Sequence, residues 1–185
     1  YKGDRYYFYD AFTLEENEIF ISPFDLNIEG GKIEDPIKPM IRIATPIYHN
    51  GEKRGVLLVN YLGGDLLESI VVGIQDGIKV NFLNQDGYWL YSTDGDNDWA
   101  FMYDDKLDLN LPKLDADLWK MLDSHEEKQF LSNGYLYTST TINPYVMAQS
   151  SSSGNNKAFS PSLTKLNPLK HKWELYTAVP ESVLY

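Results

Sequence analysis

The sequence contains no cysteine, and this absence excludes several kinds of protein at once. Without thiols there are no disulfide bonds, no thiolate zinc site and no cysteine nucleophile. Histidine is scarce as well, and none of the three, at 49, 125 and 171, lies in a pattern with the serine or carboxylate that catalysis requires. A phosphate-binding loop, a nucleophile elbow and an HExxH helix are also missing. We therefore expect no catalytic residues, no metal site and no cofactor.

The sequence also lacks long apolar runs and has few positively charged residues relative to acidic ones. No stretch approaches the roughly 18 apolar residues that span a membrane. Lysine and arginine number 16 against 27 acidic residues, which gives a net charge of −11. Nucleic acids and anionic membrane surfaces are bound by basic faces, so the composition argues against both partners.

The residues that are present suit a folded core, since 43% are hydrophobic and 14 are tyrosine. Residues 5–14 are aromatic-rich and predict a short helix. Residues 18–22 and 39–48 predict strands, because β-branched and aromatic residues alternate there. Asn50-Gly51 is a strong hairpin signal, and a third strand is expected at 55–62. Both faces of that third strand are mostly apolar, so we expect it to be central and covered on both sides.

After a short helix at 66–72, glycines at 73 and 77 mark a boundary, and the strand pattern then restarts. The second half predicts further hairpins, one helix at 111–125, a polar loop at 148–168, a last strand ending near Pro180 and an exit helix after it. The sequence thus predicts an α+β fold of two units, residues 1–76 and 77–185. Each is expected to be a central antiparallel sheet flanked by short helices.

An unusually long connection, residues 22–39, separates the first two strands. Most connections have about 4–6 residues, and longer ones commonly carry function. Pro23, Asp25 and Asn27 give this loop turn chemistry, which favours an ordered segment. We interpret it as the lid and wall of a binding cleft.

Several blocks, taken in order, resemble a known family. They are "RYYF", "ISPFDLNIE", "GGKIEDPIKPMIRIATPIY" and "KRGVLLVNYL" in the first half, and "NQDGYWLYS" and "WELYTAVP" in the second. The order and spacing resemble the extracellular double-Cache (PDC, PAS-like) sensor domain of bacterial transmembrane receptors. The resemblance is strongest over residues 5–62 and covers almost the whole chain.

The resemblance implies two tandem PAS-like units, the first membrane-distal and ligand-binding, the second membrane-proximal. It implies a periplasmic or extracellular segment of an inner-membrane protein whose output region is a histidine kinase, a diguanylate cyclase or a chemoreceptor signalling domain. The full-length receptor is expected to be a homodimer that meets the membrane only through flanking helices outside this chain. Family members begin with a long helix, which this chain lacks.

The resemblance also assigns binding residues. In relatives that bind amino acids, an arginine followed by two aromatics holds the ligand carboxylate, and Arg5, Tyr7 and Phe8 match that pattern. Phe20 falls near a further aromatic on the next strand. The family aspartate that takes the ammonium group is replaced by Asn60, which cannot neutralise a cation. A carboxylate or another polar small molecule is therefore the expected ligand.

The residues themselves add three candidates. Arg42 faces opposite to its isoleucine neighbours and either enters the cleft or ends in solvent. Ser22 and Asp25 open the long loop and are placed to close a pocket. Alternatives to ligand binding stay open. Arg5 could instead pair with Asp4 or Asp10 at the surface, and Asp25 could be only a turn residue or helix cap. Asn60, expected in a buried strand, finds its partners in the backbone or in a ligand.

Other readings of the chain remain. A docking ectodomain, with its cleft filled by its own side chains, would sense a periplasmic protein instead of a small molecule; an enzyme has the least support. "GGDLL" matches part of a diguanylate cyclase signature without the residues that follow, so it predicts a turn and a helix start. Asp94, Asp96 and Asp98 resemble a calcium loop, but Trp99 and Asp105 stand where an EF-hand needs glycine and glutamate, so a solvated acidic turn is favoured.

Overall fold

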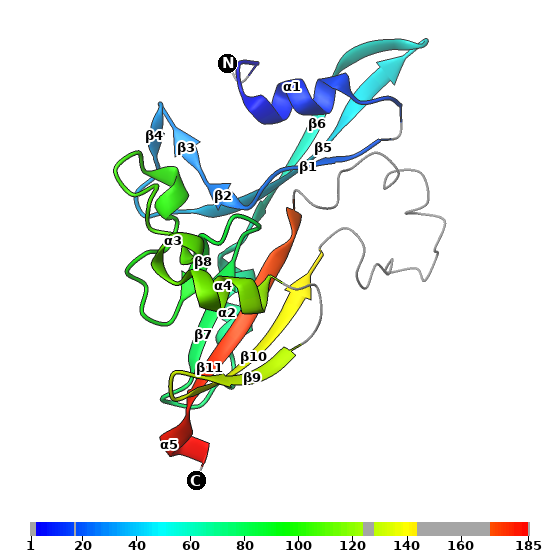
Figure 1. Ribbon diagram of the computed structural model, residues 1–185. Coiled ribbons are helices and arrows are strands. Elements are labelled where there is room, and N and C mark those ends of the chain that lie inside the picture. The colour runs from blue at the N-terminus through cyan, green and yellow to red at the C-terminus, as the bar shows by residue number, and fades with distance from the viewer. Residues whose placement is uncertain (1–2, 17, 124–127, 144–170, 185) are drawn as a thin grey trace. The chain divides into compact units, whose positions relative to one another are not determined.

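The computed structural model describes residues 3–16, 18–123, 128–143 and 171–184 (Figure 1). They form two compact units that divide between Gly64 and Asp65. Unit one comprises described residues up to 64, and unit two comprises those from 65 onward. The boundary inferred from sequence, between residues 76 and 77, lies twelve residues later and stays a prediction about domain organisation. The polar loop expected at 148–168 lies outside the described residues.

Unit one is built on a four-stranded antiparallel sheet. β5 pairs with β6 along one edge and with the short strands β1 and β2 along the other. A separate two-stranded ribbon, β3–β4, lies within the long connection. The elements are α1 (Tyr6–Thr13), β1 (Phe20–Ile21), β2 (Asp25–Leu26), β3 (Ile28–Glu29), β4 (Lys32–Ile33), β5 (Pro39–His49) and β6 (Glu52–Leu62).

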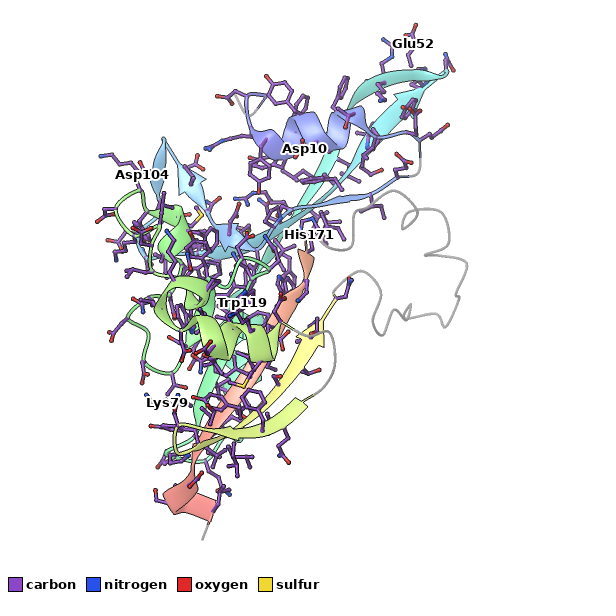
Figure 2. The ribbon with its side chains drawn as sticks, in the orientation of Figure 1. Asp10, Glu52, Lys79, Asp104, Trp119 and His171 are labelled. Atoms are coloured by element: carbon purple, nitrogen blue, oxygen red, sulfur yellow. The ribbon has the colours of Figure 1, made fainter. Side chains whose placement is uncertain are left out.

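The β5–β6 hairpin confirms the turn predicted from the sequence. Asn50 and Gly51 have φ angles of 54° and 79°, as a two-residue hairpin turn of this kind requires. Glu52 stands at the tip of the hairpin, and Asp10 lies on α1 (Figure 2). The long connection between β1 and β5 is ordered as strands and turns rather than as an extended loop.

The expectation that strand 55–62 is central and covered on both faces is wrong in this structure. β6 pairs only with β5 among the described strands, so its other edge is unpaired. One face of the hairpin also lies open, because exposed apolar side chains alternate along both strands. They are Ile43, Ile47, Leu57, Val59 and Tyr61. The apolar residues on both faces of β6 thus do not mark a strand buried on both sides, since one of these faces is not covered by any described element.

The opposite face of the hairpin is buried by α1. Tyr7 and Ala11 on one side of this helix pack with Phe20 and Ala44 in a small core. Figure 1 shows α1 running across the β5–β6 pair. The helix begins directly after Arg5, which places both Arg5 and Tyr6 at its N-terminal end.

Phe24 anchors the start of the long connection in unit one. Its side chain is buried, and so is that of Leu26 two residues later. A Cβ atom placed on Gly63 would lie 2.2 Å from the Phe24 ring, so only glycine fits there. The Gly63 amide also donates a hydrogen bond to the Pro39 carbonyl, which ties the end of β6 to the start of β5.

Unit two contains a five-stranded antiparallel sheet in the order β8-β7-β11-β10-β9. Its last strand along the chain lies in the middle of the sheet, so the unit is closed by the C-terminal residues. The elements are α2 (Gly64–Val71), which crosses the boundary, then β7 (Lys79–Leu83), β8 (Trp89–Ser92), a 3-10 turn (Ala100–Met102), α3 (Leu111–Leu114), α4 (Ala116–Leu122), β9 (Lys128–Ser132), β10 (Tyr135–Ile142), β11 (Trp173–Pro180) and α5 (Glu181–Leu184).

The single helix expected at 111–125 is two short helices in the structure. Asp115 ends α3 and caps α4, and its side chain accepts a hydrogen bond from the Leu118 amide. Its backbone is not helical, with φ −150° and ψ 82°, which breaks the helix at that point. α4 then packs Leu118 and Leu122 against Tyr176 of the central strand. His125 lies outside the described residues.

No helix in the described part of the chain is long and apolar enough to span a membrane. The described strands pair antiparallel, with short helices placed between hairpins. The predicted α+β class is therefore confirmed.

Replacing Gly63 with alanine should destabilise unit one. The new methyl group would collide with the Phe24 ring, and overpacking of this kind costs about 1–3 kcal/mol. Urea unfolding of the Gly63→Ala variant measures the loss.

Gly64→Ala is the matched control, because a Cβ atom at Gly64 meets nothing within 4 Å. Gly64 starts α2, where alanine is favoured over glycine by up to about 1 kcal/mol. Equal stability of the two variants would show that the Phe24–Gly63 contact does not constrain the fold.

Candidate functional site

The buried cation Arg42 is the centre of the candidate site. It lies on β5 on the face that α1 covers, and its side chain is only 6% exposed. The face of the Tyr7 ring lies 5.0 Å from the guanidinium carbon. The two alternatives for Arg42 are thus resolved: it points inward, under the helix, and not into solvent.

Asp25 neutralises Arg42. One carboxylate oxygen, Oδ1, accepts a hydrogen bond from Arg42 Nη1 at 2.5 Å, and the other, Oδ2, accepts one from the Tyr6 hydroxyl at 2.7 Å. The Asp25 side chain is 14% exposed, so it lies nearer the surface than its partner. Asp25 is therefore not only a cap or turn residue, because it links α1 to β5.

Two further side chains hold the guanidinium in place. Asn27 Oδ1 accepts from Arg42 Nη2 at 3.1 Å, and its own amide nitrogen donates to Glu34. Ser22 Oγ accepts from the backbone amide of Arg42 at 2.9 Å. We call Tyr6, Tyr7, Asp25, Asn27 and Arg42 the Arg42 cluster.

Burial shifts the acid–base chemistry of this cluster. Loss of solvent raises the pKa of Asp25 above its ordinary value, although Arg42 and Tyr6 act in the opposite direction. Burial and the Asp25 charge likewise raise the pKa of the Tyr6 hydroxyl, which keeps it a hydrogen-bond donor. The carboxylate raises the pKa of Arg42 against the effect of its burial. Asp25 therefore holds its charge less firmly than a surface aspartate, while Arg42 stays charged.

Arg5 lies at the N-terminal end of α1 beside the Arg42 cluster. Its Nη2 atom donates to the Ile28 carbonyl at 2.8 Å, one residue after Asn27. The ion pairs expected as alternatives, with Asp4 or Asp10, are not formed, and no ion-pair partner of Arg5 exists in the part of the chain that the structure describes. Arg5 is thus half-buried and held by a neutral group, and no described residue forms an ion pair with it.

The other predicted site residues lie at different distances from this centre. Tyr7 stacks on Arg42, and Phe20 is buried with its ring 6.5 Å from Tyr6. Phe8 stacks on Phe12 along α1, at 5.7 Å between ring centres, and is outside the cluster.

Asn60 is the cross-strand partner of Arg42, but it is exposed. The expectation that it lies in a buried strand is therefore wrong, because β6 forms an edge of the sheet.

Sequence reasoning missed Tyr6 and Asn27. Tyr6 belongs to an aromatic run that suggests a core, and its hydroxyl gave no separate signal. Asn27 was recognised only for its turn chemistry. A buried arginine needs acceptors for its several donors, so the side chains flanking Asp25 could have been searched for them.

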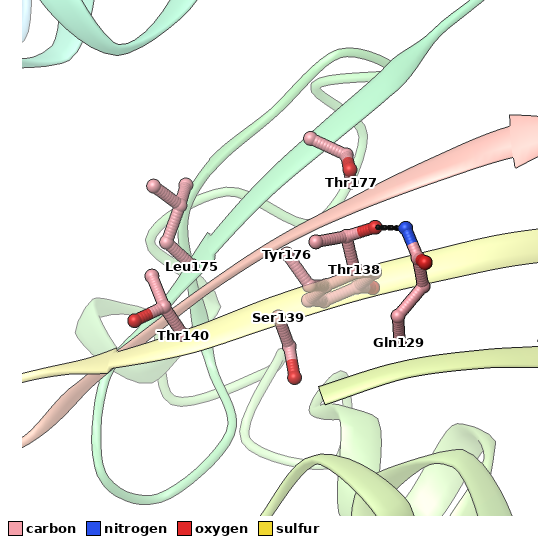
Figure 3. A pocket seen from close by; sticks show the side chains of 7 residues that line it. All are labelled: Gln129, Thr138, Ser139, Thr140, Leu175, Tyr176 and Thr177. Carbon is pink, nitrogen blue, oxygen red and sulfur yellow. Dashed lines mark hydrogen bonds between the residues drawn. The ribbon is translucent and has the colours of Figure 1, made fainter. Parts of the chain in front are cut away.

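Unit two contains a hollow whose lining, unlike the Arg42 cluster, carries no charged side chain. It has a volume of about 540 Å³ and is lined by hydroxyl, amide and aliphatic groups without a charged side chain. Figure 3 shows the lining residues, in which the Gln129 amide donates to the Thr138 hydroxyl. They are Gln129, Thr138, Ser139, Thr140, Leu175, Tyr176 and Thr177. Such a lining offers nothing to compensate an ionised ligand.

A buried carboxyl group, Glu174, lies on the central strand of unit two. Oε2 accepts from the Thr141 hydroxyl, whereas Oε1 and the Ser139 hydroxyl have no hydrogen-bond partner within the described residues. Burial raises the pKa of Glu174, although Thr141 and the Lys172 charge act to lower it. The neutral acid is therefore favoured over a wider pH range than in a surface glutamate, because burial penalises the charged form.

The acidic turn at 94–98 is held by ordinary contacts. Asp94 pairs with Lys79, and Asp98 accepts from the Ser92 hydroxyl. The described residues contain no group of three or more acidic or histidine side chains placed to hold a metal ion.

Removing Arg42 should be among the most destabilising changes in unit one. Arg42→Met leaves Asp25 buried and unpaired, which costs about 3–5 kcal/mol. The exposed pair Arg54–Glu52 provides the control, because Arg54→Met should change stability by at most about 1 kcal/mol. Denaturant unfolding of both variants measures the difference, and equal losses would mean that burial does not decide the strength of these pairs.

Glu174→Gln should alter the pH dependence of stability. A raised pKa in the folded state means that Glu174 favours folding most below the ordinary glutamate value of 4.5. That contribution is lost as pH rises through the raised folded value, so wild type should lose stability relative to Glu174→Gln over this range. Thermal unfolding at a series of pH values measures the gap.

Glu34→Gln supplies a control of opposite sign. Hydrogen bonds from Lys38 and Asn27 lower the pKa of Glu34, so its contribution is present above the ordinary value and is lost as pH falls. Parallel pH trends in the two variants would contradict the assignment of Glu174.

Three solved structures share this fold at low sequence identity. A domain of a Vibrio parahaemolyticus protein, described as belonging to the sensory box/GGDEF family, superposes with a TM-score of 0.73 at 17% identity. The periplasmic sensory domain of the Campylobacter jejuni chemoreceptor Tlp1 gives 0.61 at 14%, and the ligand-binding domain of the Pseudomonas fluorescens chemoreceptor CtaA, in complex with L-serine, gives 0.52 at 12%.

The matches cover 98%, 97% and 97% of this chain, but only 60%, 56% and 62% of those chains. This chain therefore spans less than two thirds of the structures it resembles. No curated protein sequence matches it. A family model described as "Bacterial histidine kinase, sensor domain" matches residues 2–151, which is well over half of the sequence. The chain belongs to the family of bacterial histidine kinase sensor domains.

Proposed function

We propose that this chain is the ligand-sensing region of a transmembrane signalling receptor, and that unit one binds a small carboxylate or another polar metabolite. The region lies in the periplasm or outside the cell, and a histidine kinase, diguanylate cyclase or chemoreceptor domain provides the output. Membership of the sensor-domain family supports the sensing role. The solved neighbour complexed with L-serine shows that this fold accommodates small polar ligands.

One observation carries the choice of unit one: Arg5 is a half-buried cation whose side chain donates to the Ile28 carbonyl, next in sequence to Asn27, a ligand of the buried Arg42. Two links connect Arg5 to the Arg42 cluster. Arg5 precedes Tyr6, whose hydroxyl binds Asp25, and its side chain donates to the carbonyl of Ile28, the residue after Asn27. Among the described residues, the Asp25 carboxylate forms an ion pair with Arg42 and not with Arg5. A guanidinium presents paired donors that match a carboxylate, and an anion bound there would supply the charge that Arg5 lacks.

Signalling then follows from differential affinity. A ligand shifts the receptor between two conformations only to the extent that it binds one of them better. α1 and the segment at 25–28 are already linked by the contacts of Arg5 and Tyr6. A ligand between them would tighten or loosen that link, and the C-terminal strand and helix would carry the change toward the membrane in a homodimeric receptor.

The competing function is docking of a periplasmic protein. Its support is that Arg42 is already satisfied by side chains of the chain itself. A ligand screen separates the two functions, because docking predicts no response to small molecules.

Thermal-shift screening against carboxylates, amino acids, amines and nucleobases should give at least one stabilising ligand. At 100 times its dissociation constant, a ligand adds about 2.7 kcal/mol to the free energy of unfolding. Arg5→Ala should remove the shift while the domain remains folded, because the Arg5 side chain donates a single hydrogen bond among the described residues and its backbone contacts to α1 do not depend on the side chain.

Arg54→Ala is the control, since Arg54 is an exposed arginine at the far end of the β5–β6 hairpin. A screen without hits would favour the docking function. A ligand whose shift survives Arg5→Ala would place the binding site elsewhere.

A further inference from the structure

We propose that Asp25 acts as an internal ligand of Arg42, and that the Arg42 guanidinium is a carboxylate-binding site which a small carboxylate can take over from Asp25. The inference deepens the proposed function, since it concerns regulation at the same site in unit one. In this structure the Asp25 carboxylate occupies the position that the carboxylate of a ligand would take, so the two groups compete for Arg42.

The first support is the set of donors that converge on the Asp25 carboxylate. Arg42 Nη1 donates to Oδ1, and the Tyr6 hydroxyl donates to Oδ2. These donors come from β5 and α1, whereas Asp25 belongs to the two-residue strand β2. Two independent elements therefore form a receptor for one carboxylate, and any carboxylate in that position would receive the same two hydrogen bonds.

The second support is the pattern of exposure. The Arg42 side chain is 6% exposed, and that of Asp25 is 14% exposed. The cation is thus at the back of the site and the carboxylate is nearer solvent. An incoming anion can approach from the side on which Asp25 lies, and Asp25 can leave toward water.

The backbone around Asp25 limits the exchange to its side chain. Phe24 and Leu26 are 3% and 1% exposed, and both are buried in unit one. Their burial holds the main chain on each side of Asp25 in place. Rotation of the Asp25 side chain is therefore the smallest movement that vacates the guanidinium, and the long connection need not open.

The exchange conserves charge, which identifies the ligand class. Replacing one carboxylate by another leaves Arg42 compensated, and Asn27 keeps its own hydrogen bond to Nη2. A neutral molecule would leave a buried cation unpaired, which is strongly unfavourable. The class is therefore a small monocarboxylate head group, with formate and acetate as its simplest members.

Chemical rescue tests the inference directly. Asp25→Ala removes the internal carboxylate and leaves the space that it fills. Sodium acetate should then raise the Tm of the variant in a saturable manner and restore at least half of the loss caused by the substitution. Wild type should show a smaller rise that needs a higher acetate concentration, because acetate must first displace Asp25. Sodium chloride at equal ionic strength and neutral acetamide should leave the Tm of the variant unchanged.

Two further variants define the site. In Asp25→Ala/Arg42→Met the acetate effect should vanish, because the acceptor of the anion is gone. Asp94→Ala removes one partner of the exposed Lys79–Asp94 pair and should show no acetate effect. If Asp25→Ala does not fold, Asp25→Ser retains a polar group, and NMR line broadening of ¹³C-acetate should then be larger with Asp25→Ser than with wild type.

Each contrary outcome overturns the inference. Folded Asp25 variants that ignore acetate would make Asp25 a purely structural partner of Arg42. Rescue by chloride, or rescue that persists without Arg42, would show screening or binding elsewhere. A wild type that acetate never stabilises, despite rescue of Asp25→Ala, would leave an internal ion pair that no carboxylate displaces and would overturn the exchange. The proposed function fails separately, if no screened metabolite stabilises wild type although acetate acts on both wild type and Asp25→Ala.

Discussion

The structure of unit one depends on how a single buried positive charge is compensated. Arg42 cannot stand alone beneath α1, because an unpaired charge in that position would cost several kcal/mol. Three groups surround the guanidinium: the Asp25 carboxylate of β2, the side-chain amide of Asn27 just after β2, and the ring of Tyr7 on α1. Three segments that are distant in sequence are thereby fixed together. The same charge contributes to the order of the long connection, together with the buried side chains of Phe24 and Leu26.

The two units satisfy their buried polar groups in different ways. Unit one pairs a cation with an anion and surrounds the pair with neutral donors and acceptors. Unit two buries Glu174 with a single hydrogen bond and leaves a neighbouring hydroxyl unpartnered among the described residues. Burial then favours the uncharged acid. An ion pair responds to competing anions and salt, whereas a buried acid responds to pH, so the two units are sensitive to different properties of the surrounding medium.

Local patterns predicted the elements well, and contacts between distant segments less well. Asn50-Gly51 fixed a hairpin because two positive φ angles leave few alternatives. The helix at 111–125 was predicted as one element, since its apolar spacing does not reveal that Asp115 would leave the helical conformation to cap α4. Asp25 and Arg42 were both recognised as candidates, but their pairing was not, because 17 residues separate them and no local rule joins them. The burial of Asn60 was predicted wrongly, because the apolar pattern of a strand does not show whether other segments pack against it.

The edge of β6 that no described strand covers has a consequence for the isolated chain in solution. β6 is eleven residues long, and the main-chain amides and carbonyls that point away from β5 form a border flanked by aliphatic side chains. Such a border is a template on which another extended segment can be added. The net charge of −11 keeps molecules apart by mutual repulsion, but dissolved salt shortens the range of that repulsion to roughly 8 Å at physiological ionic strength. Colloidal stability of this chain is therefore set by ionic strength: dilute buffer favours dispersed molecules, and concentrated salt favours strand-to-strand association.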